Sequence, residues 1–331
     1  MKVLVTGANG FIGSFLCPAL IEKGFGVSGL AMPGEDASRA ESLGVATLRG
    51  DLTDPASIRG IADGVDIVFH LAGRVTDWGP RSAFYSAIFD ATSNLLEEAR
   101  GKVGRFVYVS SVAACGIGRH LAGKREEDPV WRSGLPYADA KADSERLCRD
   151  RCLGADTELT IVRPSNVIGP GSVWVRDIIE RFMTSAVPVI DGGKHSASLI
   201  YVRNLVDGLV LAGTMEDAAG QMYQLRDDYD VNWKRYLDDL GAMVGKKTSV
   251  SIPYRAAWLA AYLLEKTMAP LGKRPLMTRF TAGIMGRDLD IYNTKAKREL
   301  GWKTRVSYEE AMAEIADWVA ENYKCERLPP H

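Results

Sequence analysis

The sequence predicts an α/β protein built on a doubly wound parallel sheet, and three observations support this. Short, almost wholly apolar runs alternate with stretches of helical periodicity through the first half of the 331-residue chain. Residues 1–73 contain 12 of the 33 glycines, so backbone freedom is concentrated near the N-terminus. The composition, at 46% hydrophobic and 25% charged residues, is that of a globular protein. Buried, near-continuous apolar strands separated by helices are typical of a parallel sheet covered on both faces.

The alternation begins at residues 2–6 (KVLVT), a buried strand that leads into a helix over residues 11–23. Crossovers between parallel strands are right-handed, which gives the doubly wound arrangement. Further strands are expected at residues 26–30, 46–49, 67–70, 105–109 and 160–163, and further helices at 83–100 and 137–153.

Charge and cysteine content narrow the class of protein. The chain has 41 basic and 42 acidic residues without blocks of like charge, so it lacks the electrostatic signature of nucleic-acid or anionic-membrane binding. Its five cysteines, which include Cys17, Cys115 and Cys325, form no C-x-x-C pair, and no histidine lies near Cys148 and Cys152. We therefore expect free thiols, no metal and a cytoplasmic location. Glycines interrupt the uncharged stretch 3–21, which also lacks a cleavage site, so it is not a signal peptide.

A phosphate-binding loop is expected at residues 6–13 (TGANGFIG), between the first strand and the first helix. Gly7 permits a tight turn, Gly10 lets a diphosphate approach the backbone, and Gly13 lets the helix pack against the sheet. Free N–H groups at the start of the helix attract the anion. This order of strand, glycine loop and helix predicts a dinucleotide site.

A tyrosine and a lysine four residues apart, Tyr137 and Lys141, lie on one face of a predicted helix. A phenol with a pKa of about 10 is a poor acid or base at neutral pH, and a nearby ammonium together with an oxidised nicotinamide lowers that pKa. Ser111 follows the strand 105–109 and can donate a hydrogen bond to a substrate oxygen. These groups suit the movement of a hydride and a proton across a C–OH/C=O pair.

The spacing G-x-x-G-x-x-G, combined with Ser111 and Y-x-x-x-K, resembles the short-chain dehydrogenase/reductase superfamily, and the chain length suggests its extended branch, the NAD-dependent epimerase/dehydratase family. The resemblance implies a Rossmann fold, a dinucleotide cofactor, a small-molecule substrate and a homodimer formed through helices 83–100 and 137–153. Further segments that resemble the family are GDL at 50–52, FHLAG at 69–73, RPSNVIGPG at 163–171 and IYVRNL at 200–205.

The resemblance also assigns roles. Tyr137 would be the catalytic acid/base, Lys141 would bind the ribose and lower the tyrosine's pKa, and Asp51 would accept a hydrogen bond from the adenine amino group. Catalytic residues are therefore Ser111, Tyr137 and Lys141. Substrate contacts are expected at Trp78, Ser111 and Asn166, and cofactor contacts at Gly7, Gly10, Phe11, Ile12, Gly13, Met32, Arg39, Asp51, Leu52, Leu71, Ala72, Gly73, Tyr137, Lys141 and Pro164.

The choice of dinucleotide depends on the end of the second strand. An acid there binds the ribose 2′-hydroxyl of NAD, whereas an arginine binds the 2′-phosphate of NADP. Ala31 and Met32 supply neither group, and Arg39 lies a few residues further on. Since no acid would repel a phosphate, we expect NADP or NAD with a slight preference for NADP.

Two positions depart from the family pattern. Ile88 stands where an asparagine normally supports a proton relay, so a water or another group must relay protons. Cys115 replaces the tyrosine of a typical V-Y-G segment; it either faces the substrate or, as we favour, packs in the interior.

The reaction is narrowed by the residues after Ser111. Dehydratases of the family carry an acidic pair there, but this chain has Val112 and Ala113, which disfavours elimination. The segments 77–79, 275–280 and 290–302 resemble 3β-hydroxysteroid dehydrogenase-like and 2-alkyl-3-ketoalkanoate reductase proteins. They imply an oxidoreductase acting on a ketone or secondary alcohol of an apolar, steroid- or lipid-like substrate. The alternatives are a nucleotide-sugar epimerase, in which Asn166 anchors a diphosphate, and a non-catalytic NAD(P)-binding protein.

The regular alternation ends after Pro164. We expect a dinucleotide-binding Rossmann domain over residues 1–165, with a later contribution from about 198–225, and a smaller substrate-binding lobe over 166–197 and 226–331. Within that lobe, residues 256–264 (AAWLAAYLL) are apolar but too few to span a bilayer. We expect a core helix there; the alternatives are a lip over an apolar pocket or a surface that touches lipid.

Overall fold

The computed structural model of the protein describes residues 1–152 and 156–323. Its central sheet has seven strands in the order β10-β6-β5-β4-β1-β2-β3, and all adjacent strands are parallel. Because β1 is central and the chain winds outward on both sides of it, the predicted doubly wound α/β fold is confirmed. The strands are β1 (Lys2–Thr6), β2 (Gly26–Ala31), β3 (Ala46–Arg49), β4 (Ile67–His70), β5 (Arg105–Val109), β6 (Glu158–Pro164) and β10 (Met222–Leu225).

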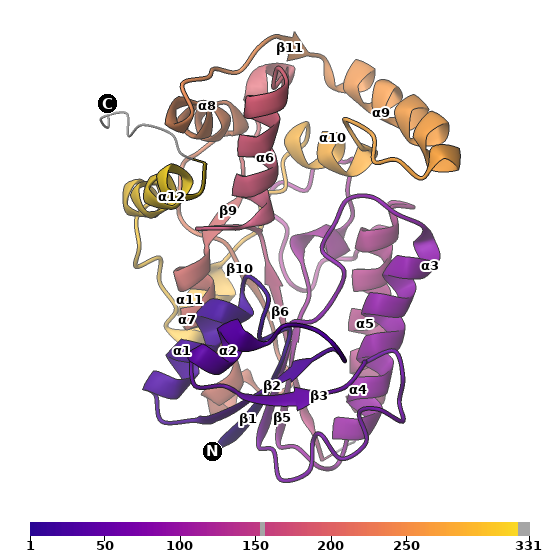
Figure 1. Ribbon diagram of the computed structural model, residues 1–331, viewed down its shortest axis with the longest axis vertical. Helices are drawn as coiled ribbons and strands as arrows, with labels where there is room; N and C mark the ends of the chain where they lie inside the picture. The colour runs from indigo at the N-terminus through magenta and orange to yellow at the C-terminus, as the bar shows by residue number, and fades with distance from the viewer. Residues whose placement is uncertain (153–155, 324–331) are drawn as a thin grey trace.

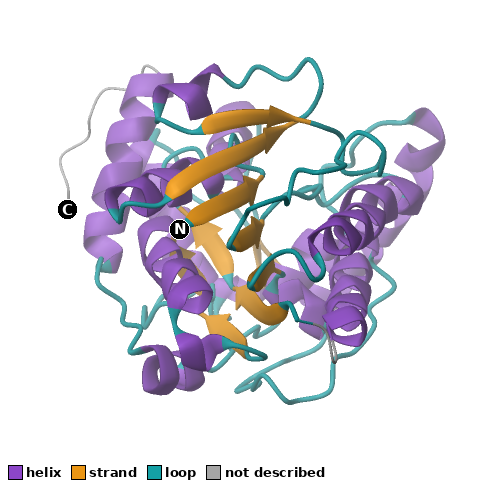
Figure 2. Ribbon diagram, turned by 90° about the horizontal axis from the view of Figure 1, so that it is seen from below, coloured by secondary structure: helices purple, strands orange, loops and turns teal. Residues whose placement is uncertain are grey.

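Helices cover both faces of this sheet (Figures 1 and 2). The alternation of side chains along β1 explains why: Val3 and Val5 pack with α1 and α7, while Leu4 packs with α4 and α5 on the opposite face. β1 is therefore apolar on both sides, as the sequence predicts. These helices are α1 (Gly13–Glu22), α7 (Val202–Thr214), α4 (Ala91–Ala99) and α5 (Pro136–Cys152), and the short α2 (Ser38–Ser42) precedes β3.

The predicted helix over 83–100 is interrupted. The chain forms α3 (Arg81–Phe84), then a π-helical turn over Tyr85–Asp90, and only then α4. A π turn changes the direction of successive side chains, and periodicity alone does not detect it. The predicted helix 137–153 is confirmed as α5, apart from residue 153, which lies outside the described residues.

The second lobe lies beyond the carboxyl ends of the strands, in the upper half of Figure 1. This region contains two small parallel sheets: β7 (Asn166–Ile168) pairs with β9 (Leu199–Tyr201), and β8 (Val189–Ile190) pairs with β11 (Ser251–Ile252). Since β7 follows β6 almost directly, the lobe begins where the sheet ends. The remaining helices are α6 (Val173–Thr184), α8 (Trp233–Met243), α9 (Tyr254–Met268), α10 (Arg279–Met285), α11 (Thr294–Leu300) and α12 (Tyr308–Tyr323).

The expectation of a core helix at residues 256–264 is wrong. In α9 only Tyr254, Ala257 and Ala261 are buried, whereas Leu259 and Leu263 are 58% and 54% exposed. Only one side of the helix contacts the lobe, so Leu259, Tyr262 and Leu263 face outward. None of the helices in residues 1–152 and 156–323 is long and apolar enough to cross a membrane.

The described cysteines are free, as expected. Cys17, Cys115 and Cys148 are buried, and Cys152 is partly buried. Cys325 lies outside the described residues.

Candidate active site

One cavity of about 1400 Å³ joins the glycine loop to the substrate lobe. It opens at the carboxyl ends of β1, β4 and β5, where ligands bind in folds of this kind. Arg39 and Trp78 are not among its lining residues. The predicted site residues that do line it are Gly7, Gly10, Phe11, Ile12, Gly13, Met32, Asp51, Leu52, Leu71, Ala72, Gly73, Ser111, Tyr137, Lys141, Pro164 and Asn166.

The glycine loop has the shape that a diphosphate requires. Gly7 adopts a positive φ of 71°, and Gly10 N donates to Gly7 O at 3.0 Å. A Cβ on Gly13 would lie 2.2 Å from Gly7 O, so only glycine lets α1 begin this close to the turn. The loop and the first N–H groups of α1 therefore fit the diphosphate of a dinucleotide.

Asp51 lies just after β3, and its carboxylate already stabilises the local loop. Its Oδ1 accepts hydrogen bonds from Thr53 N and Thr53 Oγ1, both at 2.8 Å. These bonds hold the residue in place where it lines the cavity. Recognition of adenine by Asp51 remains a prediction.

An acidic side chain, that of Glu35, lies at the end of β2, although its place in the sequence does not predict this. Glu35 lies three residues after Met32, but the loop folds back so that Glu35 Oε2 accepts from Met32 N at 2.9 Å. Asn9, within the glycine loop, donates to Glu35 Oε1 at 3.1 Å. Glu35 lines the cavity, whereas Arg39 donates to Ser14 Oγ on α1 at 3.0 Å.

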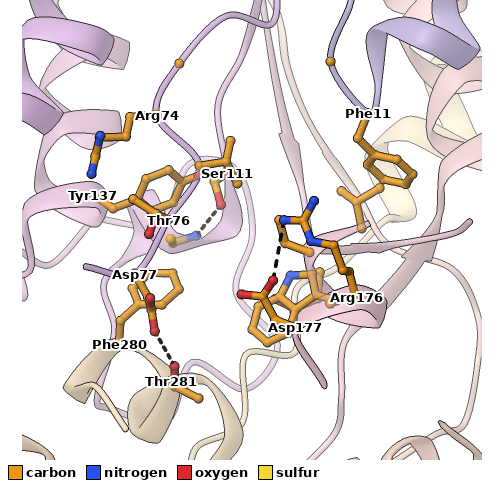
Figure 3. A pocket seen from close by; sticks show the side chains of 18 of the residues that line it. Phe11, Arg74, Thr76, Asp77, Ser111, Tyr137, Arg176, Asp177, Phe280 and Thr281 are labelled. Atoms are coloured by element: carbon orange, nitrogen blue, oxygen red, sulfur yellow. Dashed lines mark hydrogen bonds and ion pairs between the residues drawn. The ribbon is translucent and has the colours of Figure 1, made fainter. Parts of the chain in front are cut away.

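The three predicted catalytic residues come from two elements. Ser111 follows β5, and its Oγ accepts from Ala113 N at 3.2 Å. Tyr137 and Lys141 are one turn apart on α5, and Lys141 Nζ donates to Val109 O at 2.8 Å. Figure 3 shows Ser111 and Tyr137 together on one side of the cavity. The structure thus brings together residues that are 26 positions apart in the sequence.

Burial dominates the electrostatics of this group. It raises the pKa of the Tyr137 phenol, and a hydrogen bond with Ser111 opposes that rise. Burial also lowers the pKa of Lys141 to about 8. The predicted lowering of the tyrosine's pKa is therefore not what the protein alone produces, because desolvation disfavours the phenolate more than its neighbours stabilise it.

Ile88 belongs to a small apolar cluster with Phe84 and Ala140, against which Tyr137 packs. The cluster occupies the position from which the family's asparagine would act. Ile88 participates in hydrogen bonding through its backbone: its carbonyl oxygen accepts from Thr92 Oγ1 at 2.5 Å.

Cys115 is wholly buried, so its side chain packs in the interior, which is the interpretation that we favour from the sequence. It accepts a hydrogen bond from Arg163 Nη1 at 3.5 Å. Arg163 is itself paired with Glu145 at 2.6 Å, and Ser110 Oγ donates to Glu145 at 2.6 Å. This buried network fixes β5, α5 and β6 relative to one another directly behind Ser111.

On the substrate side, the residue that lines the cavity in the segment 77–79 is Asp77 rather than Trp78. Asp77 accepts hydrogen bonds from Thr278 and Thr281, each at 2.9 Å, and pairs with Arg274 at 2.8 Å. Figure 3 shows the Asp77–Thr281 contact below Tyr137. Asp77 therefore fastens this loop to the substrate lobe, a contact between residues about 200 positions apart that no local pattern predicts.

Asn166 lines the cavity but is already engaged, since its Nδ2 donates to Ala197 O at 2.7 Å. Most of the surrounding wall is apolar. The Tyr137 ring meets Phe280, which lines the cavity, edge-on at 5.6 Å, and it also packs at 6.5 Å from the buried Phe84, which does not line the cavity. Other apolar residues that line this part are Val75, Trp174, Ile178, Leu237, Leu264, Leu276, Met277, Ile284 and Met285.

A glycine-rich turn at the head of a doubly wound sheet, opening into a cavity with Tyr137 and Lys141, defines an NAD(P)-dependent enzyme of the Rossmann type. Sequence comparison gives the family. The chain belongs to the NAD dependent epimerase/dehydratase family, whose sequence profile matches residues 3–225. The predicted membership of the extended short-chain dehydrogenases is thereby confirmed.

Curated relatives align over nearly the whole chain. A 4-hydroxy-2-methyl-3-oxo-4-farnesyl-3,4-dihydroquinoline-1-oxide ketoreductase from Stigmatella aurantiaca is 29% identical over 94% of this chain and 95% of its own. A 2-alkyl-3-oxoalkanoate reductase from Stenotrophomonas maltophilia is 28% identical, covering 95% and 98%. A 3 beta-hydroxysteroid dehydrogenase/Delta 5-->4-isomerase from Mycobacterium tuberculosis is 30% identical, covering 95% and 89%.

Solved structures share the fold. The crystal structure of gox2253 superposes with a TM-score of 0.81 at 25% identity and covers 98% of this chain and 99% of its own. A UDP-glucose 4-epimerase from Thermotoga maritima has a TM-score of 0.78 at 21% identity, covering 98% of this chain and all of its own. At that identity the second likeness concerns the fold alone.

Proposed function

We propose that the protein interconverts a ketone and a secondary alcohol on a largely apolar, steroid- or lipid-like substrate, with NAD(P) as the redox partner. The observation that carries this proposal is the apolar wall beside Tyr137, where Phe280 meets the ring edge-on and further apolar side chains line the cavity toward α10. Pockets of this composition bury apolar ligands and use a few polar groups to orient them.

In this mechanism the dinucleotide, when bound, supplies or accepts the hydride. The protein supplies the proton. Tyr137 Oη donates a proton to the ketone oxygen during reduction, and Ser111 Oγ holds that oxygen by a hydrogen bond. Lys141, fixed through Val109 O, places a positive charge behind the tyrosine when it is protonated. The aromatic ring of Phe280, which lines the cavity beside Tyr137, excludes water from the reacting carbon.

The relatives' names agree with such a substrate. One is a ketoreductase whose named substrate carries a farnesyl group and an oxo group, and another is named for a hydroxysteroid. Both names pair a polar oxygen with an extended apolar skeleton. We extend only this chemical class to the present chain.

A nucleotide-sugar epimerase needs cations available for a diphosphate in the substrate lobe. The described arginines that line the cavity are engaged. Arg176 pairs with Asp177 at 3.5 Å, and Arg274 pairs with Asp77 at 2.8 Å. Arg181 and Arg74 donate to backbone carbonyl oxygens. Asn166, the expected anchor, donates to a backbone carbonyl instead. These contacts favour the oxidoreductase over the epimerase.

The test is a panel of apolar ketones, secondary alcohols and nucleotide sugars, with NAD(P)H absorbance as the readout. A reductase changes the absorbance stoichiometrically with ketone. Tyr137→Phe should lower kcat by about 10²–10⁴-fold while dinucleotide binding changes little, because only the proton donor is lost. Conversion of a nucleotide sugar without net absorbance change would refute the proposal in favour of the epimerase. Dinucleotide binding without any turnover would do so in favour of a binding protein.

We propose NAD as the preferred dinucleotide. The slight preference for NADP rests on the missing acid at Ala31 and Met32, and Glu35 restores an acid at that place through its hydrogen bond with Met32 N. A carboxylate there accepts from a 2′-hydroxyl and repels a 2′-phosphate.

Glu35→Gln should therefore shift the ratio of NADP to NAD affinity toward NADP by about tenfold or more, the worth of one charge-assisted hydrogen bond. Glu41→Gln, on the exposed side of α2, is the matched control. An unchanged ratio in Glu35→Gln, with a changed ratio in Arg39→Ala, would instead support NADP.

We further propose a cytoplasmic homodimer formed through α4 and α5, which lie side by side on one face of the sheet (Figure 1). Arg146 on α5 is exposed, and its side chain pairs only loosely with Asp143, at 3.5 Å. Native mass spectrometry should give a dimer, and Arg146→Glu should weaken it. A monomer at micromolar concentration would contradict the proposal.

A further inference from the structure

Three side chains from distant parts of the chain meet outside the cavity described above: His120, His195 and Asp288. Asp288 lies between the two rings, with Oδ2 at 2.9 Å from His120 Nδ1 and Oδ1 at 3.0 Å from His195 Nδ1. One candidate ligand atom from each residue can be chosen so that all three lie within 4.8 Å of one another. None of the three lines the catalytic cavity.

One buried ring nitrogen of this cluster has no hydrogen-bond partner. His195, whose side chain is 7% exposed, has a carboxylate at each ring nitrogen: Asp288 at Nδ1 and Asp191 Oδ2 at 3.6 Å from Nε2. Nε2 is buried and has no hydrogen-bond partner. A neutral imidazole carries a single N–H, so one of its two nitrogens must turn a lone pair toward a carboxylate.

His120 presents the same ring nitrogen to two groups of Asp288. The backbone N–H of Asp288 lies 3.3 Å from His120 Nδ1, and Asp288 Oδ2 lies 2.9 Å from it. The contact with Oδ2 is attractive when a proton or a metal ion lies between the nitrogen and the oxygen.

We propose that His120, His195 and Asp288 bind a divalent transition metal ion of the zinc type. Two imidazole nitrogens and a carboxylate oxygen are borderline ligands that suit such an ion, and a fourth position remains for water. Tetrahedral zinc with bonds of about 2.0–2.1 Å holds its ligands about 3.3 Å apart. In the structure one ligand atom from each residue can be chosen with all three within 4.8 Å, so side-chain rotation must bring the widest pair closer when the ion binds.

Asp191 completes the site as an outer partner. If His195 Nε2 carries the proton and donates it to Asp191, Nδ1 is left free for the metal, which is the usual role of a carboxylate behind a ligating histidine. Asp191 is itself held by Tyr254 N, which donates to it at 2.8 Å, and by Arg287 at 3.8 Å.

The metal would have a structural role. The loop that contains His120 runs between Ser111 and Tyr137, and it lies against residues 288–292 of the substrate lobe. Leu121 N donates to Asp288 O at 2.7 Å, and Tyr292 N donates to Lys124 O at 3.0 Å. A metal at His120 and Asp288 would fasten this catalytic loop to the lobe that binds substrate.

The test titrates EDTA-treated full-length protein with Zn²⁺ by calorimetry and with Co²⁺ by visible absorption. Wild type should bind one equivalent of either ion, and Co²⁺ should give the d–d bands of a tetrahedral site. His195→Gln and His120→Gln should abolish both signals, and Asp191→Asn should weaken Zn²⁺ affinity by about 10–100-fold. Asp290→Asn is the matched control, because Asp290 is two residues away but pairs with Arg226.

Bound Zn²⁺ should also slow hydrogen exchange in residues 118–124 of wild type and not of His195→Gln. Failure of wild type to bind either ion would overturn the proposal, as would equal affinities in wild type and both histidine variants. His331 is present in wild type and in every variant, so metal binding by His331 cannot cause a difference in affinity between them. These readouts do not depend on catalytic activity.

Discussion

Replacing Glu145 with glutamine should destabilise the protein far more than the same change at an exposed ion pair. Glu145 and Arg163 have side chains that are 2% and 1% exposed. Two hydrogen bonds join them, from Arg163 Nε at 2.7 Å and from Arg163 Nη2 at 2.6 Å, and Ser110 Oγ donates a third at 2.6 Å. The variant leaves a buried guanidinium without its counter-charge.

The expected loss of unfolding free energy in Glu145→Gln follows from the burial of the Glu145–Arg163 pair. Removing one partner of a buried ion pair costs about 3–5 kcal/mol, since the remaining charge stays desolvated. Glu97 and Arg151 form the matched control: their contact is 2.8 Å, but their side chains are 60% and 41% exposed. An exposed pair contributes about 1 kcal/mol or less.

Urea unfolding measures the difference, with the fluorescence of the buried Trp233 and Trp302 as the signal. Glu145→Gln should lose about 3 kcal/mol or more of unfolding free energy, and Glu97→Gln about 1 kcal/mol or less. Equal losses in the two variants would refute the reasoning, because they would mean that burial does not govern the energy of this pair.

Two further predictions concern the cofactor site. Gly13→Ala should abolish dinucleotide binding measured by calorimetry, because its Cβ would lie 2.2 Å from Gly7 O and force α1 away from the loop; wild-type affinity would contradict this. The buried Lys141 has its pKa lowered to about 8. Between about pH 8 and 10 the unfolded chain keeps that proton and the folded chain does not, so stability should rise with pH by about 3 kcal/mol relative to Lys141→Met. A pH-independent difference between the two proteins would show that the amine stays protonated.

Much of the fold could be predicted because its signals are local. The strands at 46–49, 67–70 and 105–109 have the predicted bounds. The strands 67–70 and 105–109 are buried along nearly their whole length, so each appears in the sequence as a short apolar run, whereas 46–49 lies at the edge of the sheet and is only partly buried. Prediction of burial from the sequence fails where one side of a helix packs against the protein and the other side faces solvent. Residues 256–264 look like a core helix, yet α9 exposes Leu259 and Leu263 because only one side of it meets the lobe.

The candidate site likewise has one part that the sequence predicts and another that only the structure shows. The glycine loop, and the pair Tyr137 and Lys141, are contiguous motifs whose spacing carries their chemistry, so the sequence by itself determined the dinucleotide site and the candidate acid/base. The contacts that residues of the site make with distant parts of the chain could be found only in the structure. Glu35 reaches the end of β2 because the intervening loop folds back, and Asp77 meets Thr281 across 204 positions.

The cluster of His120, His195 and Asp288 is the clearest case, since its outermost residues are 168 positions apart. Sequence patterns report the conformational preferences of neighbouring residues, and these fix the helices, the strands and the motifs. Contacts between distant side chains depend on how those elements pack. Tertiary structure alone therefore decided the shape of the apolar wall, the contact of Glu35 with the end of β2 and the meeting of the two histidines.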